Sequence, residues 1–227
     1  MLYLVPTPIG NLRDITLRAL DVLKEADVIA CEDTRHTHKL LAHYEIKKPV
    51  VSYHDHSDEA KTHELVARLE KGETIALVSD AGMPLISDPG FPLVRDAIRK
   101  GIRVEALPGP FAGVTALAAS GLPAETFYFA GFLPQKSAAR KRKLADLIER
   151  PETLMFYESP YRVDKVLAEM AEIFGDREAV VARELTKKFE EIVRGPLAEL
   201  VPRFSEKTNK GEFVILVSGK DRKKVLL

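Results

Sequence analysis

The sequence predicts a two-domain α/β protein whose first domain has a mainly parallel five-stranded sheet and whose second has a mixed sheet. Apolar runs of strand length alternate with amphipathic stretches of helical spacing in five successive units. After Gly121-Leu122-Pro123 this regular alternation of strands and helices changes, and two later strands can pair locally as a hairpin. With 227 residues, the chain is long enough for a substantial core. We therefore expect an N-terminal domain over 1–121 and a C-terminal domain over 122–227.

The first half repeats a strand–loop–helix unit, which is the signature of a parallel sheet covered on both faces. Thr16 can cap the first helix, and Gly72 and Gly101 can end two later helices. In order, the expected elements are strand 2–5, helix 16–25, strand 27–31, helix 35–43, strand 50–53, helix 58–71, strand 74–79, helix 91–100, strand 103–107 and a helix of small residues over 114–120.

The second half mixes local strand pairing with single helices, which favours a smaller mixed sheet. The run FEEIVRG can pair as a hairpin with the strand before it. In order, the expected elements are strand 126–131, helix 136–149, strand 153–158, helix 161–174, strand 179–184, strand 189–195, helix 197–204 and strand 213–218.

Composition limits the classes of function. The 34 basic residues balance 34 acidic ones, which argues against a general polyanion binder but allows a local basic patch. The single Cys31 can form no internal disulfide, as in a reducing cytoplasm. No apolar stretch approaches the roughly 18 residues of a membrane helix, and the first residues lack a signal-peptide pattern. We expect a cytoplasmic protein that uses neither a membrane nor DNA.

The stretch HDHSDE (54–59) resembles the first ligands of a zinc hydrolase. Such a site needs about three histidines from separate loops, yet all six histidines precede residue 64 and Cys31 is the only thiol. His54 and His56 then read as polar loop groups, with Ser57 or Asp58 as a helix cap. We expect no metal, and a metal-dependent hydrolase stays an alternative.

Ligands of open α/β sheets bind outside the carboxyl ends of the strands, so the loops there are the candidate sites. The glycine-rich dinucleotide, P-loop and nucleophile-elbow motifs are all absent from the sequence. In SDAGMPLISDPG, Asp80 can accept hydrogen bonds from a ribose or an ammonium group, and Gly82 allows close approach of a flat ligand. In PGPFAG, Gly109 and Ala112 leave backbone open in the same way. Turn formation and packing are the structural alternatives for both loops.

KSAARKRK (136–143) has five basic residues in eight positions. It is either a solvated helix face or a set of phosphate contacts for RNA. In ARELTKKFEE, Arg183, Glu184 and Lys187 follow a strand closely, so they can share a cleft or form an ion-pair network between domains.

A set of ordered motifs, spread from Met1 to about Gly219, resembles the ribosomal RNA small subunit methyltransferase I family of the tetrapyrrole (precorrin) methylase superfamily. One departure is Met83, where family members usually have threonine. The motifs, as they stand here, are TPIGNLRDIT, CEDTRHTHKLL, SYHDHSDE, LVSDAGMPLISDPG, ALPGPFAGVTAL, GFLPQKS, FYESPYR, ARELTKKFEE and KGEFVILV.

The resemblance implies a class III methyltransferase with two α/β domains and an active site in the cleft between them. It implies S-adenosyl-L-methionine as cofactor, a homodimer, and methylation of the ribose 2′-oxygen of a cytidine in the decoding region of 16S rRNA in the small ribosomal subunit. Transfer from a sulfonium needs alignment of three atoms but neither a metal nor a covalent nucleophile. A ribose hydroxyl is a weak acid, so a base or a cation near its oxygen should help.

The resemblance also implies residue roles. Cofactor-binding residues are expected at Pro8, Ile9, Ser79, Asp80, Ala81, Gly82, Met83, Phe111, Ala112, Tyr157 and Leu185. Catalytic residues are expected among Asp33, Glu184 and Lys187, and RNA-binding residues at Arg35, His36, Lys136, Arg140 and Arg142. Two further alternatives stay open: a small-molecule methylase of the same superfamily, and an RNA-binding module without enzymatic activity.

Overall fold

The computed structural model describes residues 1–54, 59–205 and 209–220. The chain divides into two compact units, Met1–Phe111 and Ala112–Leu227. Each unit contains one five-stranded sheet, in the order β3-β2-β4-β1-β5 in the first and β6-β7-β10-β8-β9 in the second. The expected two-domain α/β architecture is confirmed.

The first sheet is parallel throughout, with β1 between β4 and β5 and with β2 between β3 and β4. Parallel neighbours need crossover connections, which the helices supply. The elements are β1 (Leu2–Leu4), a 3-10 turn η1 (Leu12–Asp14), α1 (Leu17–Glu25), β2 (Val28–Cys31), α2 (Thr34–His43), β3 (Val50–Ser52), α3 (Glu59–Glu70), β4 (Ile75–Val78), α4 (Phe91–Arg99) and β5 (Val104–Ala106).

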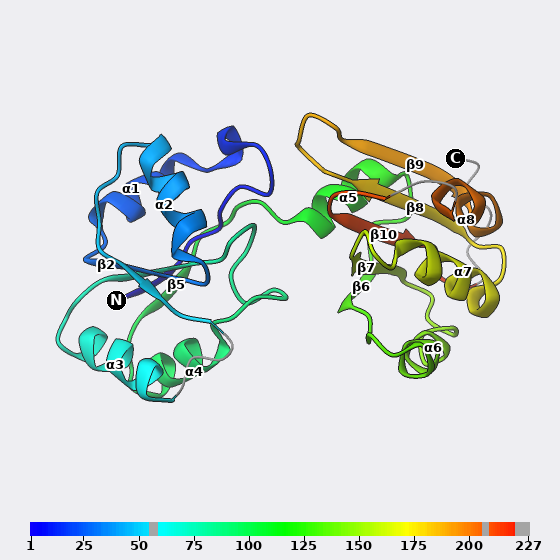
Figure 1. Ribbon diagram of the computed structural model, residues 1–227. Coiled ribbons are helices and arrows are strands. Elements are labelled where there is room, and N and C mark those ends of the chain that lie inside the picture. The colour runs from blue at the N-terminus through cyan, green and yellow to red at the C-terminus, as the bar shows by residue number, and fades with distance from the viewer. Residues whose placement is uncertain (55–58, 206–208, 221–227) are drawn as a thin grey trace. The chain divides into compact units, whose positions relative to one another are not determined.

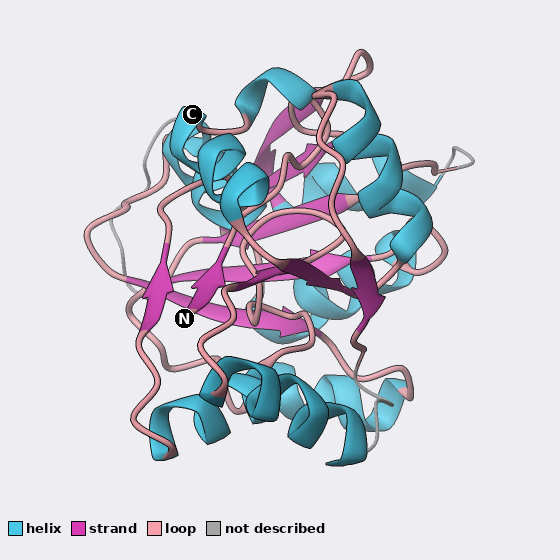
Figure 2. Cartoon of the chain, turned by 90° about the vertical axis from the view of Figure 1, so that its left-hand side faces the viewer, coloured by secondary structure: helices cyan, strands magenta, loops and turns pink. Residues whose placement is uncertain are grey.

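Helices cover both faces of this sheet, which is why its central strands are apolar on both sides. α1 and α2 pack on one face around Leu23, Leu41 and Ile29. α3 and α4 pack on the other around Leu65 and Leu93. Figure 1 shows α1 and α2 on the side opposite α3 and α4, and Figure 2 shows strands between layers of helices.

The second sheet is mixed. β6 and β7 are parallel, whereas β10 is antiparallel to both β7 and β8. β8 and β9 form the expected antiparallel hairpin. The elements are α5 (Ala112–Ser120), β6 (Phe127–Phe132), α6 (Ser137–Ala145), β7 (Thr153–Glu158), α7 (Val163–Phe174), β8 (Glu178–Arg183), β9 (Glu191–Pro196), α8 (Leu197–Ser205) and β10 (Phe213–Val217).

The helix α5 packs against β7 and β10, so it belongs to the second unit. α6, α7 and α8 cover the opposite face of that sheet, around Leu144, Phe156 and Met170. Met155 and Leu216 point away from those helices and are nevertheless fully buried. The contacts therefore divide the chain after Phe111, about ten residues before the expected boundary, because the small-residue helix serves the second sheet.

Helix and strand positions follow the sequence-based expectations closely. Thr16 caps α1 by accepting a hydrogen bond from the backbone N–H of Ala19. The main difference is α6, which ends at Ala145, whereas the expected helix runs to 149; turns occupy 146–149. The expected caps Ser57 and Asp58 lie outside the described residues. No helix in the described part of the chain is long and apolar enough to cross a membrane.

Candidate functional site

The loops that follow β1 and β4 are joined into one ledge at the carboxyl edge of the first sheet. The backbones of Thr7 and Gly82 exchange two hydrogen bonds, each of 2.9 Å. The Thr7 hydroxyl donates to the carbonyl of Ser79 at 3.0 Å, and the Ser79 hydroxyl donates to the carbonyl of Gly82 at 3.1 Å. Because both hydroxyls are buried and bonded internally, Thr7 and Ser79 shape the ledge instead of presenting donors to a ligand.

Glycine is required at two positions of this ledge. Gly82 has φ +85°, and a Cβ there would lie 3.4 Å from Cγ2 of Ile9. A Cβ at Gly109 would lie 2.6 Å from Cβ of Pro6, which is a clash with a rigid ring. The loops after β1, β4 and β5 therefore approach one another closely through backbone atoms.

Non-glycine residues in the left-handed region gather in two of the candidate loops. Among the described residues five non-glycine residues have positive φ, and four of these are Leu85 and Ser87 after β4 and Glu184 and Thr186 after β8. Such residues cost free energy and persist where the surroundings fix them, which is frequent at functional sites. Both loops were selected from the sequence for their chemistry.

Asp80 lies beside a cavity of about 270 Å³ at the carboxyl edge of the first sheet. One of its oxygens accepts the backbone N–H of Asp33 at 3.0 Å, and the other lies 3.6 Å from Nδ1 of His36. Because 3.6 Å is longer than a hydrogen bond, this second oxygen is still open to accept one from a ribose or an ammonium group. The cavity approaches the usual lower bound of ligand pockets, about 300 Å³, so it suits part of a nucleoside-sized ligand. It is lined by Thr7, Pro8, Leu12, His36, Thr37, Lys39, Leu40, Ser79 and Asp80.

Asp33, expected to be catalytic, is engaged in local structure. It caps α2 by accepting the backbone N–H of Arg35 at 2.8 Å, and its carboxylate also pairs with the Arg35 guanidinium at 2.6 Å. These hydrogen bonds from Arg35 hold the pKa of Asp33 far below its usual range. A carboxylate with so low a pKa is a poor proton acceptor, so the geometry does not favour Asp33 as a general base. The guanidinium of Arg35, which was expected to contact RNA, forms an ion pair with the Asp33 carboxylate.

In the second unit, Lys187 and Glu184 meet as expected, together with Glu212. The ammonium of Lys187 donates to Oε1 of Glu184 at 2.8 Å and to Oε2 of Glu212 at 2.9 Å. Burial alone would lower the pKa of Lys187, but these two carboxylates outweigh it and the pKa is raised. The hydrogen bond from Lys187 in turn lowers the pKa of Glu184. Lys187 is thus a fixed cation, and all three residues belong to the second unit.

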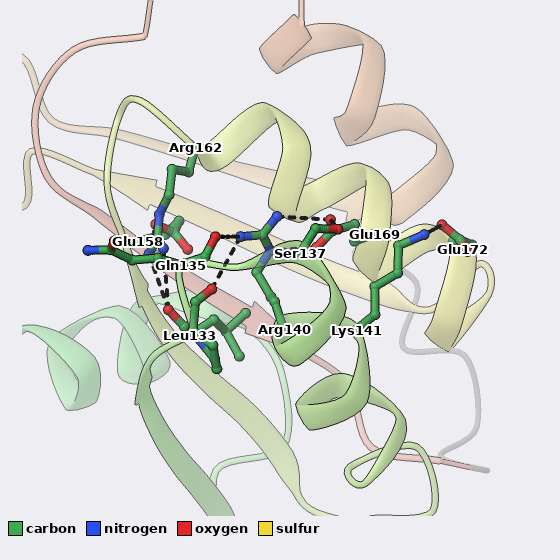
Figure 3. Close-up of polar contacts among 10 residues, drawn as sticks. Leu133, Gln135, Ser137, Arg140, Lys141, Glu158, Arg162, Glu169 and Glu172 are labelled. Atoms are coloured by element: carbon green, nitrogen blue, oxygen red, sulfur yellow. Dashed lines mark hydrogen bonds and ion pairs between the residues drawn. The ribbon is translucent and has the colours of Figure 1, made fainter.

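Arg140 requires a correction, because the expected phosphate contact is a buried structural residue. Its side chain is 5% exposed and pairs with Glu169 on α7 through Nε and Nη2. Its Nη1 donates to the carbonyls of Gln135 at 2.9 Å and Pro134 at 3.2 Å (Figure 3). Every guanidinium nitrogen has a partner within the fold and the side chain is buried, so Arg140 is not available to an RNA phosphate.

The other cations of the basic run differ in exposure. Lys141 pairs with Glu172 at 2.6 Å, and Lys143 lies over the ring of Tyr128. Lys136 and Arg142 are exposed, and neither has a salt-bridge partner among the described residues. The structure thus leaves two of the three predicted phosphate contacts of this run accessible.

The remaining expected cofactor residues occupy several elements. Ala81 is exposed and Met83 half-buried in the loop after β4; Phe111 precedes α5, and Ala112 begins it. Tyr157 lies on β7, and Leu185 is buried just after β8. Within the first unit, the structure brings together Pro8, Ile9 and 79–83 with Asp33 and His36, and Phe111 is the last residue of that unit.

No group of three or more histidine, cysteine, aspartate or glutamate side chains could hold a metal ion within the residues that the structure describes. His56 lies outside those residues. Sequence reasoning missed Thr7, Thr37 and Lys39 of the cavity, and it missed the exposed aromatic residues of the second unit. The three cavity residues stand in the TPIGN and CEDTRHTHKLL motifs, beside the predicted Pro8 and His36, so their position after strands is the signal that could have found them.

Residues 1–201 match the sequence profile of the Tetrapyrrole (Corrin/Porphyrin) Methylases. The chain therefore belongs to the tetrapyrrole methylase family. Solved structures agree on the fold: a cobalt precorrin-4 methyltransferase aligns with a TM-score of 0.70 at 22% identity, covering 96% of this chain and 94% of that one. Uroporphyrin-III-C-methyltransferase from Thermus thermophilus aligns with a TM-score of 0.68 at 25% identity, covering 96% and 94%.

Curated relatives point to a narrower group. The chain is 55% identical over 222 residues to "Ribosomal RNA small subunit methyltransferase I" of Vibrio cholerae, covering 96% of this chain and 77% of that protein. It is 50% identical over 225 residues to the protein of the same name from Bacillus subtilis, covering 99% and 77%. The resemblance inferred from the motifs is confirmed.

Proposed function

We propose that this protein transfers a methyl group from S-adenosyl-L-methionine to the ribose 2′-oxygen of a cytidine in the decoding region of 16S rRNA. The methylase family and the relatives named ribosomal RNA small subunit methyltransferase I support rRNA methylation. The observation that carries the proposal is the ledge of Thr7 and Gly82 with the Asp80 carboxylate beside it.

The residues of the ledge fit the cofactor. Asp80 offers an open carboxylate oxygen to a ribose or an ammonium group, and the exposed Ala81 leaves backbone accessible. Pro8 and Asp80 line a cavity that takes part of a nucleoside-sized ligand. When bound, the cofactor supplies an electrophilic methyl group. Ser79, Ile9 and Gly82 set the shape of the ledge. The Ser79 hydroxyl donates to the carbonyl of Gly82, and the Ile9 side chain lies next to Gly82.

For the reaction, we assign Lys187 as the cation that stabilises the 2′-oxygen while the proton of that hydroxyl passes to a water molecule and the methyl group bonds to the oxygen. Its pKa is raised, so it stays protonated at neutral pH and acts as a cation instead of a base. Glu184 and Glu212 hold the ammonium in place. Asp33 positions α2 and Arg35, in keeping with its low pKa.

The proposed substrate contacts are His36 in the first unit and Lys136 and Arg142 in the second. Each has an exposed side chain able to meet a phosphate or a base. We propose that the enzyme works as a homodimer in the cytoplasm on the small subunit rRNA.

Calorimetry with S-adenosyl-L-methionine tests the cofactor site. Asp80→Asn keeps an oxygen for the Asp33 N–H but removes the charge, so the affinity should fall roughly 10- to 150-fold, as for a hydrogen bond to a charged group. Asp21→Asn changes an exposed acid on α1 and should bind as the wild type does. Equal affinity of Asp80→Asn and wild type would refute the assignment of Asp80.

The substrate is tested by mapping ribose methylation in rRNA from cells that lack this gene. We expect one 2′-O-methylcytidine of 16S rRNA to disappear, to return with the wild-type gene and to stay absent with Asp80→Asn. An unchanged methylation map would reject the proposed function in favour of a small-molecule substrate.

A further inference from the structure

A bulge in β6 brings an aromatic side chain onto the same face as its neighbours. The register of β6 and β7 shifts between Phe129 and Gly131, where Gly131 has φ +63°. A bulge of this kind reverses the side-chain alternation that follows it. As a result Phe132 lies opposite Tyr157, with ring centroids 5.6 Å apart, and Phe129 contacts the same tyrosine ring at 5.0 Å.

The end of this aromatic cluster faces solvent. Phe132 is 58% exposed although it is a large apolar side chain on a strand, and Tyr161, in the loop after β7, is 87% exposed. Exposed apolar side chains that gather on one surface mark candidate interaction sites.

Buried polar contacts hold together the two segments that carry the exposed rings. The fully buried carboxylate of Glu158 accepts the backbone N–H of Ser159 at 2.6 Å and the Arg162 guanidinium at 2.7 and 2.9 Å. Arg162 also donates to the carbonyl of Leu133 at 3.4 Å (Figure 3). Arg162 follows Tyr161 and Leu133 follows Phe132, so this clamp links the loops that carry the two rings.

The chain around Phe132 carries charge of one sign. No acidic residue lies between Glu125 and Asp146, a span that contains four aromatic and five basic residues. Two of those cations, Arg140 and Lys141, are neutralised by α7. Lys136, four residues after Phe132, is exposed and has no salt bridge among the described residues. Exposed aromatic rings beside an unneutralised cation are the combination that binds single-stranded nucleic acid.

We propose that Phe132, Tyr161 and Lys136 form an RNA-binding surface, the aromatic–basic surface, on which unpaired bases stack and a phosphate is neutralised. This inference rests on the proposed function, because it assumes that the substrate is RNA. It assigns base contacts to residues outside the basic helix, and it gives Arg162 and Glu158 the role of positioning residues.

The test is the affinity for a fluorescein-labelled single-stranded RNA of 12 nucleotides that contains one cytidine, measured by fluorescence anisotropy at two salt concentrations. Phe132→Ala and Tyr161→Ala should each weaken binding about 5- to 150-fold, the loss of one stacked base. Phe132→Tyr should bind as the wild type does, whereas Phe132→Leu, which stays apolar but cannot stack, should bind as poorly as the alanine variant.

The matched control is Phe127→Ala, because Phe127 is a partly exposed aromatic residue at the other end of the same strand. Its RNA affinity should equal that of the wild type. Lys136→Ala should reduce the slope of log K against log salt by about 1, whereas Phe132→Ala should leave that slope unchanged. Calorimetry with the cofactor should give wild-type affinity for all these variants.

The outcomes separate this inference from the proposed function. If the wild type binds and methylates RNA but Phe132→Ala and Tyr161→Ala match Phe127→Ala, the surface is not used and the inference is overturned while the function stands. If the wild type binds no RNA, the proposed function fails first. If light scattering shows that Phe132→Ala turns a dimer into monomers, the surface binds a second copy of the chain and the inference is also overturned.

Discussion

Replacing Arg140 tests the correction made to the basic helix. Arg140→Met would remove the counter-ion of the buried Glu169 carboxylate, which keeps only the Ser137 hydroxyl, and the donor to two carbonyl groups. Removing one partner of a buried ion pair costs about 3–5 kcal/mol, a large share of the roughly 5–15 kcal/mol that stabilises a domain. We expect the free energy of unfolding to fall by that amount, measured by urea denaturation followed by circular dichroism.

Two further variants give this prediction its control. Lys141→Met breaks the neighbouring pair with Glu172, whose side chains are 40% and 61% exposed, and should cost no more than about 1 kcal/mol. The double variant Arg140→Met with Glu169→Met removes both buried charges and should come close to the wild type. If Arg140→Met costs no more than Lys141→Met, the guanidinium is not a structural anchor and its assignment to RNA returns.

The same pair predicts a pH dependence. Burial alone would raise the pKa of Glu169, but hydrogen bonds from Arg140 and Ser137 outweigh it, so the pKa lies below the ordinary value. A lowered carboxyl pKa stabilises the fold above the unfolded pKa, about 4.3, and this share is lost as the pH falls through the folded pKa. The wild type should therefore lose more stability than the double variant when the pH is lowered from 6 towards 3. An identical pH dependence of the two proteins would contradict the sign of this shift.

Three other expectations follow from single sites. Gly109→Ala places a Cβ 2.6 Å from Pro6 and should cost about 1–3 kcal/mol in urea denaturation; an unchanged midpoint would show that the loop shifts freely. The buried thiol of Cys31, whose pKa is raised by burial, should react with a thiol reagent only as fast as the first unit unfolds, so rapid labelling in native buffer would argue against its burial. Lys187→Met should lower kcat about 100- to 1,000-fold with little change in KM for RNA, Lys187→Arg should recover part of it, and the exposed Lys165→Met should not differ from the wild type. Equal kcat for Lys187→Met and Lys165→Met would remove Lys187 from the reaction.

The fold could be predicted from sequence because its information is local. Strands such as 75–78 and 213–217 are apolar at every position, and caps such as Thr16 bond a backbone N–H only three residues away. The place of α5 could not be predicted in this way. Its small residues fit either sheet, and only contacts with β7 and β10, far along the sequence, assign it to the second unit.

The sequence predicts which types of residue lie at the candidate site, but it predicts the role of each residue less well. Asp80 is predicted as an acceptor for a ribose or an ammonium group because it directly follows a buried strand, and Lys187 is predicted because it follows a strand close to Arg183 and Glu184. Asp33 and Ser79 are also polar residues after strands, yet their polar atoms are bonded to Arg35 and Gly82, and a sequence does not show that a donor or an acceptor is already used. The sequence also does not predict the left-handed backbone conformation of Leu85 and Thr186, because glycine is the usual sign of a positive φ.

Arg140 shows what separates a structural cation from a functional one. In the run KSAARKRK all five cations look alike, but Arg140, Leu144 and Leu147 follow helical spacing i, i+4, i+7 and form the buried face of α6 and its last turn. A charged residue in phase with buried leucines needs a buried counter-ion, and Glu169 on α7 supplies it. Lys136 and Arg142 do not lie on that buried face, so they stay candidates for phosphate contacts. The same reasoning applied to β6, where a bulge takes Phe132 out of its expected phase, leaves an aromatic ring exposed where the fold has no use for it. In both elements, the candidate functional side chains are those that are not buried in the core of the unit.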